Sequence, residues 1–158
     1  MFRPVRRKAN EMGSSATEAL LKVSRRGVLA MQGENGYPYA IPINYFYDES
    51  TREIYFHGSR FGYKIEALGK SAKVCLTVVG EEVIKDEDWA PYVQSAVVFG
   101  TCCLMEHNDE AMARLKQFAM KYYPDEHLVD DQIARSGRPT QMFIISIDHM
   151  SGKEVQEK

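Results

Sequence analysis

Short apolar runs recur along the chain and predict strands, and residues of two faces alternate in the longest of them. Six segments carry this alternation or are rich in the β-branched and aromatic residues that favour strands, namely residues 28–31, 37–47, 53–58, 73–79, 94–107 and 141–149. Pro38 and Pro42 both fall in the second segment. Because proline has no backbone N–H, this strand is predicted to lie at a sheet edge or to break near Pro42.

Helical spacing of apolar residues marks the start of the chain and a short segment in its middle. Ser15 and Glu18 fit a capping box that opens a helix over residues 15–26, and Gly27 suits its C-terminal end. Within residues 59–68, Ile65 and Leu68 lie three positions apart and predict a second, short helix.

The last third of the chain predicts a longer helix. A helix over residues 109–123 begins after a cap at Asn108 or Asp109 and ends at Pro124. Residues 127–137 add one or two further helical turns before the last strand.

The order of these elements indicates the fold class. Strands do not alternate with helices, so a doubly wound parallel sheet is disfavoured. Asn35-Gly36 supplies the positive φ angles of a tight hairpin between the first two strands. We therefore expect a mainly β protein, a six-stranded antiparallel split β-barrel with peripheral helices. Residues 1–158 are expected to form one domain, with residues 1–12 as an N-terminal arm.

Composition narrows the classes of partner. The 158 residues include 20 basic and 22 acidic side chains, a net charge of −2, which favours neither nucleic acid nor an anionic membrane. The chain has no apolar run of transmembrane length, and no apolar segment follows its basic start as in a signal peptide. Cys75 stands apart, and the adjacent Cys102 and Cys103 would point to opposite faces of a strand, which predicts reduced thiols, no metal site and a cytoplasmic location.

The segment from His57 to Lys64 holds the first candidate chemistry. Gly58 allows close backbone approach, Ser59 offers a hydroxyl, and Lys64 brings a full charge to a predicted helix start. Such a combination can cradle a phosphate, although a solvated basic turn fits the same residues. His57, at the strand end, is either a proton donor to a substrate or a structural histidine.

The proline-containing strand is the second candidate. Pro42 removes a ladder donor, so backbone groups after it could meet a planar heterocycle, and Asn44 offers both a donor and an acceptor. A barrel strand with core aromatics is the alternative interpretation of the same residues.

Taken in order, these stretches resemble a known family. The stretches are Gly36-Tyr37-Pro38-Tyr39, Pro42-Ile43-Asn44-Tyr45, Ile54-Tyr55-Phe56-His57-Gly58 and Gly62-Tyr63-Lys64. Together they resemble the pyridoxamine-phosphate-oxidase-like flavin-binding split barrels. Within this family, the chain looks most like the Nim-type nitroimidazole-resistance branch. The further stretches that carry this likeness are Met1-Phe2-Arg3-Pro4-Val5-Arg6-Arg7, Val98-Phe99-Gly100 and Gly152-Lys153.

This resemblance implies a homodimer with a flavin at each interface site, FMN or alternatively FAD, and a small-molecule substrate. It implies that Pro42, Ile43, Asn44 and Tyr45 line the isoalloxazine, largely through backbone groups. It implies further that Phe56, His57, Gly58 and Ser59 flank the ring and the ribityl chain. It assigns the phosphate to Lys64, the catalytic role to His57, and a contribution from the partner subunit to Trp89 and the strand that carries Ser95 and Val97. Arg60 and Phe61 stand where smaller residues are common, which leaves FMN and FAD both open.

Two functions follow as hypotheses. The first is a flavin-dependent oxidoreductase, in the Nim branch a reductase of the nitro group of nitroimidazoles. The alternative is a flavin- or haem-binding protein of the same fold without turnover.

Overall fold

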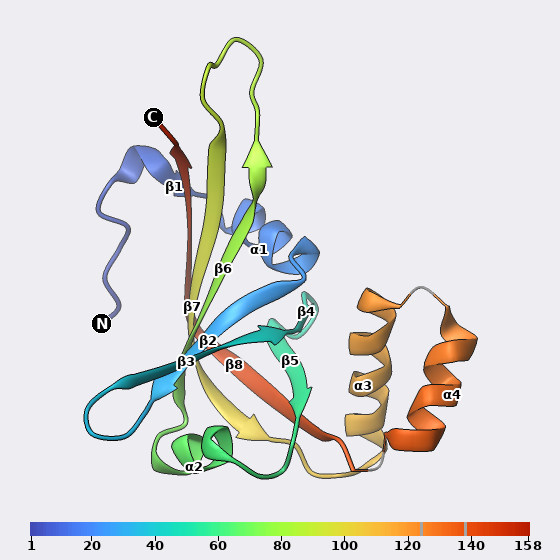
Figure 1. Ribbon diagram of the computed structural model, residues 1–158. Coiled ribbons are helices and arrows are strands. Elements are labelled where there is room, and N and C mark those ends of the chain that lie inside the picture. Colours follow the sequence, from blue (N-terminus) through green and yellow to red (C-terminus); the bar gives the residue numbers. More distant parts are fainter. Residues whose placement is uncertain (124, 138) are drawn as a thin grey trace.

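The computed structural model describes residues 1–123, 125–137 and 139–158 (Figure 1). A short 3-10 helix, four α-helices and eight strands follow one another in the order η1 (Lys8–Asn10), β1 (Glu11–Met12), α1 (Ser14–Val23), β2 (Arg26–Gln32), β3 (Pro38–Asn44), β4 (Phe46–Asp48), β5 (Glu53–Gly58), α2 (Tyr63–Lys70), β6 (Lys73–Val83), β7 (Tyr92–Leu104), α3 (Asp109–Tyr122), α4 (Glu126–Ser136) and β8 (Gln141–Gln156).

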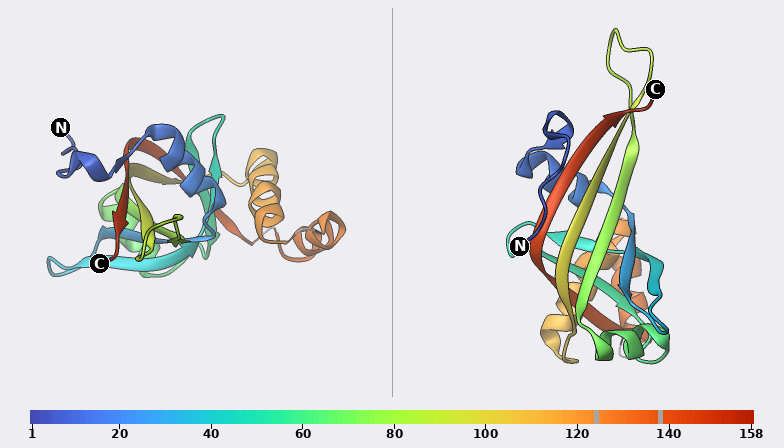
Figure 2. Two further views of the ribbon diagram at one scale, coloured as in Figure 1. Left: turned by 90° about the horizontal axis from the view of Figure 1, so that it is seen from above. Right: turned by 90° about the vertical axis from the view of Figure 1, so that its left-hand side faces the viewer.

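All the strands belong to one antiparallel sheet, in the order β3-β2-β6-β7-β8-β5-β4, with β1 paired to β8 outside this path. The two additional views show how this sheet curls on itself, with the helices on its periphery (Figure 2). The predicted fold class is therefore confirmed. The count of six strands is corrected to eight, because the segment 37–47 splits into β3 and β4 and the two-residue β1 carries no sequence pattern of its own.

The curl closes at Tyr45. Strands β3 and β4 lie at opposite edges of the sheet, yet only Tyr45 separates them in the chain. The backbone of Tyr45 pairs with neither neighbouring strand, and the hydroxyl of Tyr122 on α3 bonds to it instead. This hydroxyl accepts from the Tyr45 N–H at 2.9 Å and lies 2.6 Å from the Tyr45 carbonyl oxygen. The edge position predicted for β3 is confirmed, and the break falls three residues beyond Pro42.

The core fills the curl. Large side chains from every long strand meet there with no exposed surface, including Leu29, Phe56, Leu76, Val98 and Phe143. Phe56 and Phe143 face each other across the β5–β8 pair with ring centroids 4.7 Å apart and nearly parallel planes. A second, smaller cluster lies between the outside of β5 and α3.

The first helix differs from its prediction at both ends. The N-cap of α1 is Gly13, with no side-chain cap, so Ser15 and Glu18 form no capping box; Glu18 instead pairs with Arg52 at 3.4 Å. Gly27 is not a helix cap, because the helix ends at Val23 and Gly27 lies within β2. There a Cβ would come within 2.8 Å of the Leu76 side chain, so close packing of β2 against β6 explains the glycine.

The remaining helices follow their predictions more closely. Asn108 caps α3 by accepting from the Ala111 N–H, as expected, and Asp125 caps α4 in the same way. Pro124, predicted to end the long helix, lies outside the described residues. Helix α2 begins at Tyr63 after Gly62, whose φ of +106° only glycine adopts readily, so Ser59 precedes the helix rather than opening it.

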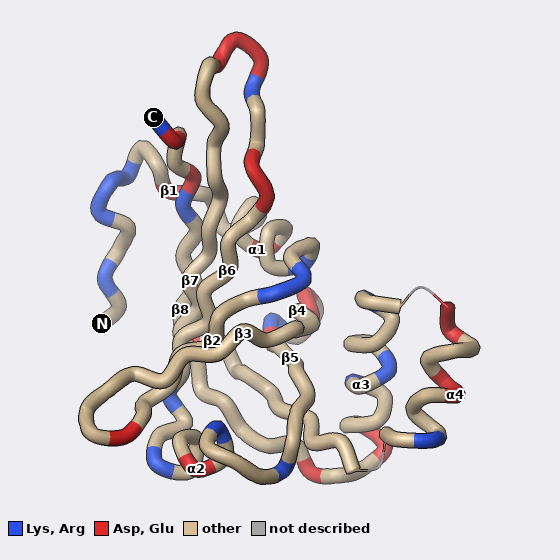
Figure 3. The backbone as a smooth tube through the Cα atoms, in the orientation of Figure 1, with Lys and Arg blue, Asp and Glu red and all other residues tan. Residues whose placement is uncertain are grey.

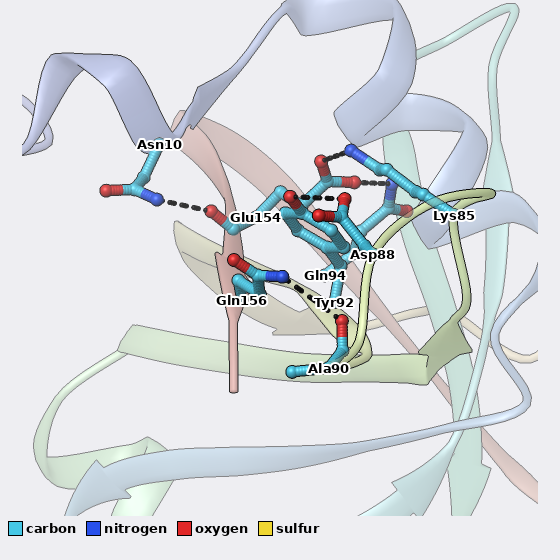
Figure 4. Close-up of polar contacts among 8 residues, drawn as sticks. All are labelled: Asn10, Lys85, Asp88, Ala90, Tyr92, Gln94, Glu154 and Gln156. Atoms are coloured by element: carbon cyan, nitrogen blue, oxygen red, sulfur yellow. Dashed lines mark hydrogen bonds and ion pairs between the residues drawn. The ribbon is translucent and has the colours of Figure 1, made fainter. Parts of the chain in front are cut away.

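Charge is distributed unevenly along the molecule (Figure 3). Basic residues follow one another along the N-terminal arm, whereas acidic residues gather on the connection between β6 and β7. At the base of that connection, the Glu154 carboxylate accepts from Lys85 and from Gln94, and the Asn10 amide donates to the Glu154 carbonyl (Figure 4). These contacts tie the arm, the hairpin and β8 together. None of the described helices has the length and apolar character required to cross a bilayer.

Candidate functional site

The end of β5 and the start of α2 form a compact basic site. Lys64, the second residue of α2, turns back toward the open end of the barrel, where its Nζ lies 4.6 Å from the centroid of Phe143 and 5.4 Å from that of Phe56. A Cβ at Gly58 would collide with this Nζ. The glycine that ends β5 is therefore required for the ammonium to occupy this place.

The Lys64 ammonium has no counter-charge within the described part of the chain. It is half-buried, and no carboxylate of the described residues pairs with it. Burial lowers its pKa below the usual value. The nearby Cys102 thiol is also buried, which raises its pKa to about 12, so it stays neutral. A partly desolvated cation of this kind is stabilised by an incoming anion.

Strand β3 is an edge strand, so one side of its backbone is unpaired in the sheet. Pro42 lies opposite Val28 in the β2–β3 ladder, and proline fits only where its nitrogen faces away from the partner strand. The backbone groups of Ala40 and Asn44, two residues away on either side, therefore face the free edge as well. The Ile43 side chain turns into the core, whereas the side chains of Pro42 and Asn44 are exposed.

Helix α2 connects the basic site to β3. The ring of Tyr63 packs on Tyr39 of β3 with centroids 4.5 Å apart, and its hydroxyl accepts from the Glu34 N–H at 2.6 Å. Lys70 at the other end of α2 pairs with the Glu34 carboxylate at 2.8 Å. Tyr63, the residue before Lys64, therefore contacts β3 directly, and the roles of Lys64 and of the β3 edge in holding a phosphate and a planar ring stay predictions.

His57 faces a different compartment. It precedes Gly58 on β5, so its side chain points to the outside of the barrel, toward α3, where its ring meets Phe118 edge-on at 4.8 Å. Burial first, and then the charge of Lys64, lower the pKa of His57 below 6.5. The imidazole is therefore neutral at pH 7 and carries one donor and one acceptor. It borders a cleft of about 760 Å³ between the end of β5, α3 and α4.

Three predicted cofactor residues have no side chain available to a ligand. Tyr45 is fully buried and donates its hydroxyl to the Leu21 carbonyl, Phe56 is stacked in the core, and Ile43 is buried. The backbone of Tyr45 is occupied as well, by the Tyr122 hydroxyl. Ser59 is exposed, and its hydroxyl accepts from the Phe61 N–H at 3.1 Å.

Trp89, Ser95 and Val97 lie away from Lys64 within one chain. The β6–β7 connection that carries Trp89 projects from the opposite end of the sheet to α2 (Figure 1). Ser95 and Val97 belong to the outer face of β7, beside the partly exposed Phe99. Their contribution to a partner's site stays a prediction.

Sequence reasoning missed Phe143 and Tyr122. Phe143 reaches Phe56 through the β5–β8 pairing, across more than 80 positions of sequence, and no local pattern identifies such a partner. Tyr122 looks like one more residue near the end of α3, and only the fold shows that its hydroxyl meets the Tyr45 peptide.

Comparison with solved structures shows the same fold. A candidate 5-nitroimidazole antibiotic resistance protein from Bacteroides thetaiotaomicron is 21% identical over 92% of this chain and 87% of its own, with a TM-score of 0.75. An FAD-binding protein from Mesorhizobium loti is 19% identical over 92% and 96%, with a TM-score of 0.65. An FAD- and haem-binding protein from Mycobacterium smegmatis is 19% identical over 94% and 74%, with a TM-score of 0.71.

A search of the curated proteins found no match. The model of one protein family, described as pyridoxamine 5'-phosphate oxidase, matches residues 14–154. This match runs from the start of α1 almost to the end of β8 and confirms the resemblance found in the sequence. The chain belongs to the pyridoxamine 5'-phosphate oxidase family.

Proposed function

We propose that this protein is a flavin-dependent oxidoreductase that acts on a small molecule, with FMN as its cofactor and FAD as the alternative. One observation carries the proposal: the half-buried Lys64 ammonium has no carboxylate partner among the described residues, and the residue before it, Tyr63, packs on Tyr39 of the edge strand β3. A flavin nucleotide combines an anion with a planar heterocycle, and these two features require a cation and edge donors or acceptors.

The residues at this end of the barrel fit such a group. Lys64 would bind the phosphate from the position that its ammonium takes against Gly58, and Ser59, the residue after Gly58, would offer its hydroxyl. The edge backbone between Pro42 and Tyr45 would line the ring. The flavin, when bound, supplies the electron transfer, and the protein supplies position and electrostatics.

We further propose a homodimer with the flavin at the interface. Apolar side chains stand exposed on the outer faces of β2, β6 and β7, where Val28, Val79 and Phe99 are 46%, 61% and 38% exposed. Burying this face against a second copy would remove it from water and bring the partner copy's β7, with Ser95 and Val97, and its β6–β7 connection, with Trp89, near the site. The proposed location is the cytoplasm.

His57 is the proposed catalytic residue. Its neutral imidazole can hold or pass a proton at the outer side of β5, one residue from the Gly58–Lys64 contact. Reduction of a nitroimidazole is the specific reaction we propose to test first, because the similar Bacteroides thetaiotaomicron protein is described as a candidate resistance protein for that drug class.

The alternative is a binding protein without turnover, for flavin or for haem. The similarity to an FAD- and haem-binding protein from Mycobacterium smegmatis supports considering it. The absorption spectrum of the purified protein separates flavin from haem, and the mass of the released cofactor separates FMN from FAD.

The decisive experiment measures nitro-group reduction with a nicotinamide donor in the wild type and in His57→Ala. We expect the flavin to stay bound in the variant and turnover to fall roughly a hundredfold, the loss typical of a removed acid–base group. His127→Ala is the control, because His127 is 88% exposed on α4 and borders no part of this cleft in the described chain. Equal turnover in wild type and His57→Ala makes His57 structural, and an absence of turnover in the wild type favours the binding protein.

A further inference from the structure

The cleft between β5, α3 and α4 lies on the opposite side of β5 from Lys64, the residue proposed to bind the flavin phosphate. We infer that it binds the small molecule on which the proposed chemistry acts, and that this molecule is neutral and largely apolar. The inference rests on the proposed function for the reaction, but the binding itself can be tested without it.

The walls of the cleft are mainly apolar. Leu115 and Phe118 of α3 face Val129 and Ile133 of α4 across it. Helices α3 and α4 stand together to one side of the barrel (Figures 1 and 2), so this space is built by the pair and the outer side of β5. Such a surface gains free energy when an apolar molecule displaces its water.

Apolar side chains also remain exposed at the opening. Tyr123 and Leu128 border the cleft and are 64% and 65% exposed. Large apolar groups clustered at a concave opening are typical of ligand sites, whereas single exposed apolar residues need no explanation. The volume of about 760 Å³ lies within the range of small-molecule sites.

The charges at the cleft favour a neutral ligand. Among the described lining residues, Asp125 is the one acidic side chain, and its carboxylate accepts from the Leu128 N–H at the start of α4. His57 is neutral because of its lowered pKa. A carboxylate-bearing ligand would meet Asp125 without a described cation in the lining, whereas a neutral one avoids this repulsion.

His57 gives the ligand a polar contact and connects the two compartments. It is the lining residue contributed by β5, and the next residue, Gly58, adjoins Lys64 on the other side of the strand. A molecule in the cleft that bonds to the imidazole therefore lies at the strand end where the proposed cofactor site begins. A polar atom at one end of an apolar body, such as an amide or nitro group on an aromatic ring, suits this geometry.

The test uses two ring compounds that differ in charge. Isothermal titration of the full chain compares 2-naphthamide with 2-naphthoate. We expect the amide to bind at least tenfold more tightly than the carboxylate and to shift the imidazole resonances of His57 in NMR spectra. Equal or stronger binding of the naphthoate overturns the inference.

A matched pair of variants locates the binding. Ala119 lines the cleft, whereas Ala113 is exposed on the same helix and does not. Ala119→Trp fills the cleft and should weaken naphthamide binding at least tenfold, and Ala113→Trp should leave it unchanged. Unchanged affinity in Ala119→Trp places the amide elsewhere and overturns the inference.

A second variant tests the same site in case Ala119→Trp does not fold. Leu128→Glu changes an already exposed side chain, so the fold is retained, and adds a carboxylate at the opening. It should also weaken naphthamide binding, and wild-type affinity in this variant contradicts the assignment. If the amide does not bind and Ala119→Trp instead converts dimer to monomer, a second copy fills the cleft and the inference fails.

Cofactor analysis of the same preparations separates the two proposals. Bound flavin without naphthamide binding removes the cleft assignment and leaves the proposed function intact. Naphthamide binding in a protein that takes up neither flavin nor haem removes the proposed function, and with it the assignment of this molecule as a substrate.

Discussion

Lys64 and Lys85 lie toward opposite ends of the sheet, and each places its ammonium over an aromatic ring. They differ in burial, in the direction of their pKa shift and in having a carboxylate partner. Lys85 places its Nζ 3.9 Å from the centroid of Tyr92, and Lys64 places its Nζ 4.6 Å from that of Phe143. The Glu154 carboxylate bonds to Lys85 and raises its pKa (Figure 4), whereas burial lowers the pKa of Lys64, which no described carboxylate faces.

The difference separates a cation that is neutralised within the chain from one that the proposed phosphate would neutralise. Glu154 also accepts from Gln94 at 2.8 Å, so the charge of Lys85 is satisfied within the chain and joins the hairpin to β8. The charge of Lys64 lies over two aromatic rings, which attract it but do not neutralise it. A cation–π contact alone therefore does not indicate function, and the missing carboxylate does.

The largest expected effect is that of Lys64→Ala on flavin affinity. A charge-assisted phosphate contact contributes about 1.5–3 kcal/mol, so the dissociation constant should rise roughly ten- to a hundredfold. Quenching of FMN fluorescence measures it. Wild-type affinity in Lys64→Ala would remove this residue from the site and erase the contrast with Lys85.

A third lysine, Lys121, tests how burial of a lysine changes the free energy of unfolding. Lys121 donates to the carbonyls of Ser24 at 2.5 Å and Tyr45 at 3.1 Å, and burial, with Arg25 nearby, lowers its pKa to about 8. Between pH 8 and the unfolded value near 10.5, the unfolded chain keeps the proton that the folded chain has lost. The free energy of unfolding therefore rises with pH in this window.

The magnitude is modest because part of the Lys121 side chain reaches water. Each pKa unit corresponds to about 1.4 kcal/mol, and partial solvation reduces the total to about 1 to 2 kcal/mol. Urea unfolding at pH 8 and pH 10 should show this gain in the wild type and not in Lys121→Met. Identical pH dependence in the two proteins assigns the gain to other groups.

The smallest expected effect is that of Lys85→Ala. Exposed ion pairs contribute little, so the melting temperature should fall by no more than about 3 °C and flavin affinity should not change. Differential scanning calorimetry and the same fluorescence titration measure both. Loss of flavin affinity would show that the hairpin end of the sheet participates in the site, directly or through a partner copy.

The sequence predicted those elements whose signals are local. The run of β-branched and aromatic residues placed β5 at its observed bounds, Asn35 and Gly36 adopt the positive φ angles expected of the hairpin, and Asn108 caps α3. The Gly27 prediction was wrong because a glycine required by strand packing has the same local sequence as one that ends a helix.

The candidate site could be predicted only in part. Gly58 and Lys64 lie six residues apart, so their meeting was predictable, as was the edge position of a strand containing Pro42. The opposite orientations of His57 and Lys64 depend on which side of β5 the helices α3 and α4 cover, and pairing across the whole chain decides this. The burial of the Tyr45 and Phe56 side chains in the core depends on the same pairing, and no local pattern reveals it.

The Tyr122 hydroxyl joins parts of the molecule that are usually considered separately. Tyr122 is the last residue of α3, a helix that lines the cleft, and its hydroxyl contacts both the N–H and the carbonyl of Tyr45, which connects β3 to β4. The same hydroxyl lies 2.6 Å from the carbonyl oxygen of Arg25, the residue before β2, and the Arg25 guanidinium lies over the Tyr122 ring. A movement of α3 must therefore either break these hydrogen bonds or shift the backbone around Tyr45 with the helix. The Tyr122 side chain thus couples the position of α3 to that of the β3–β4 connection.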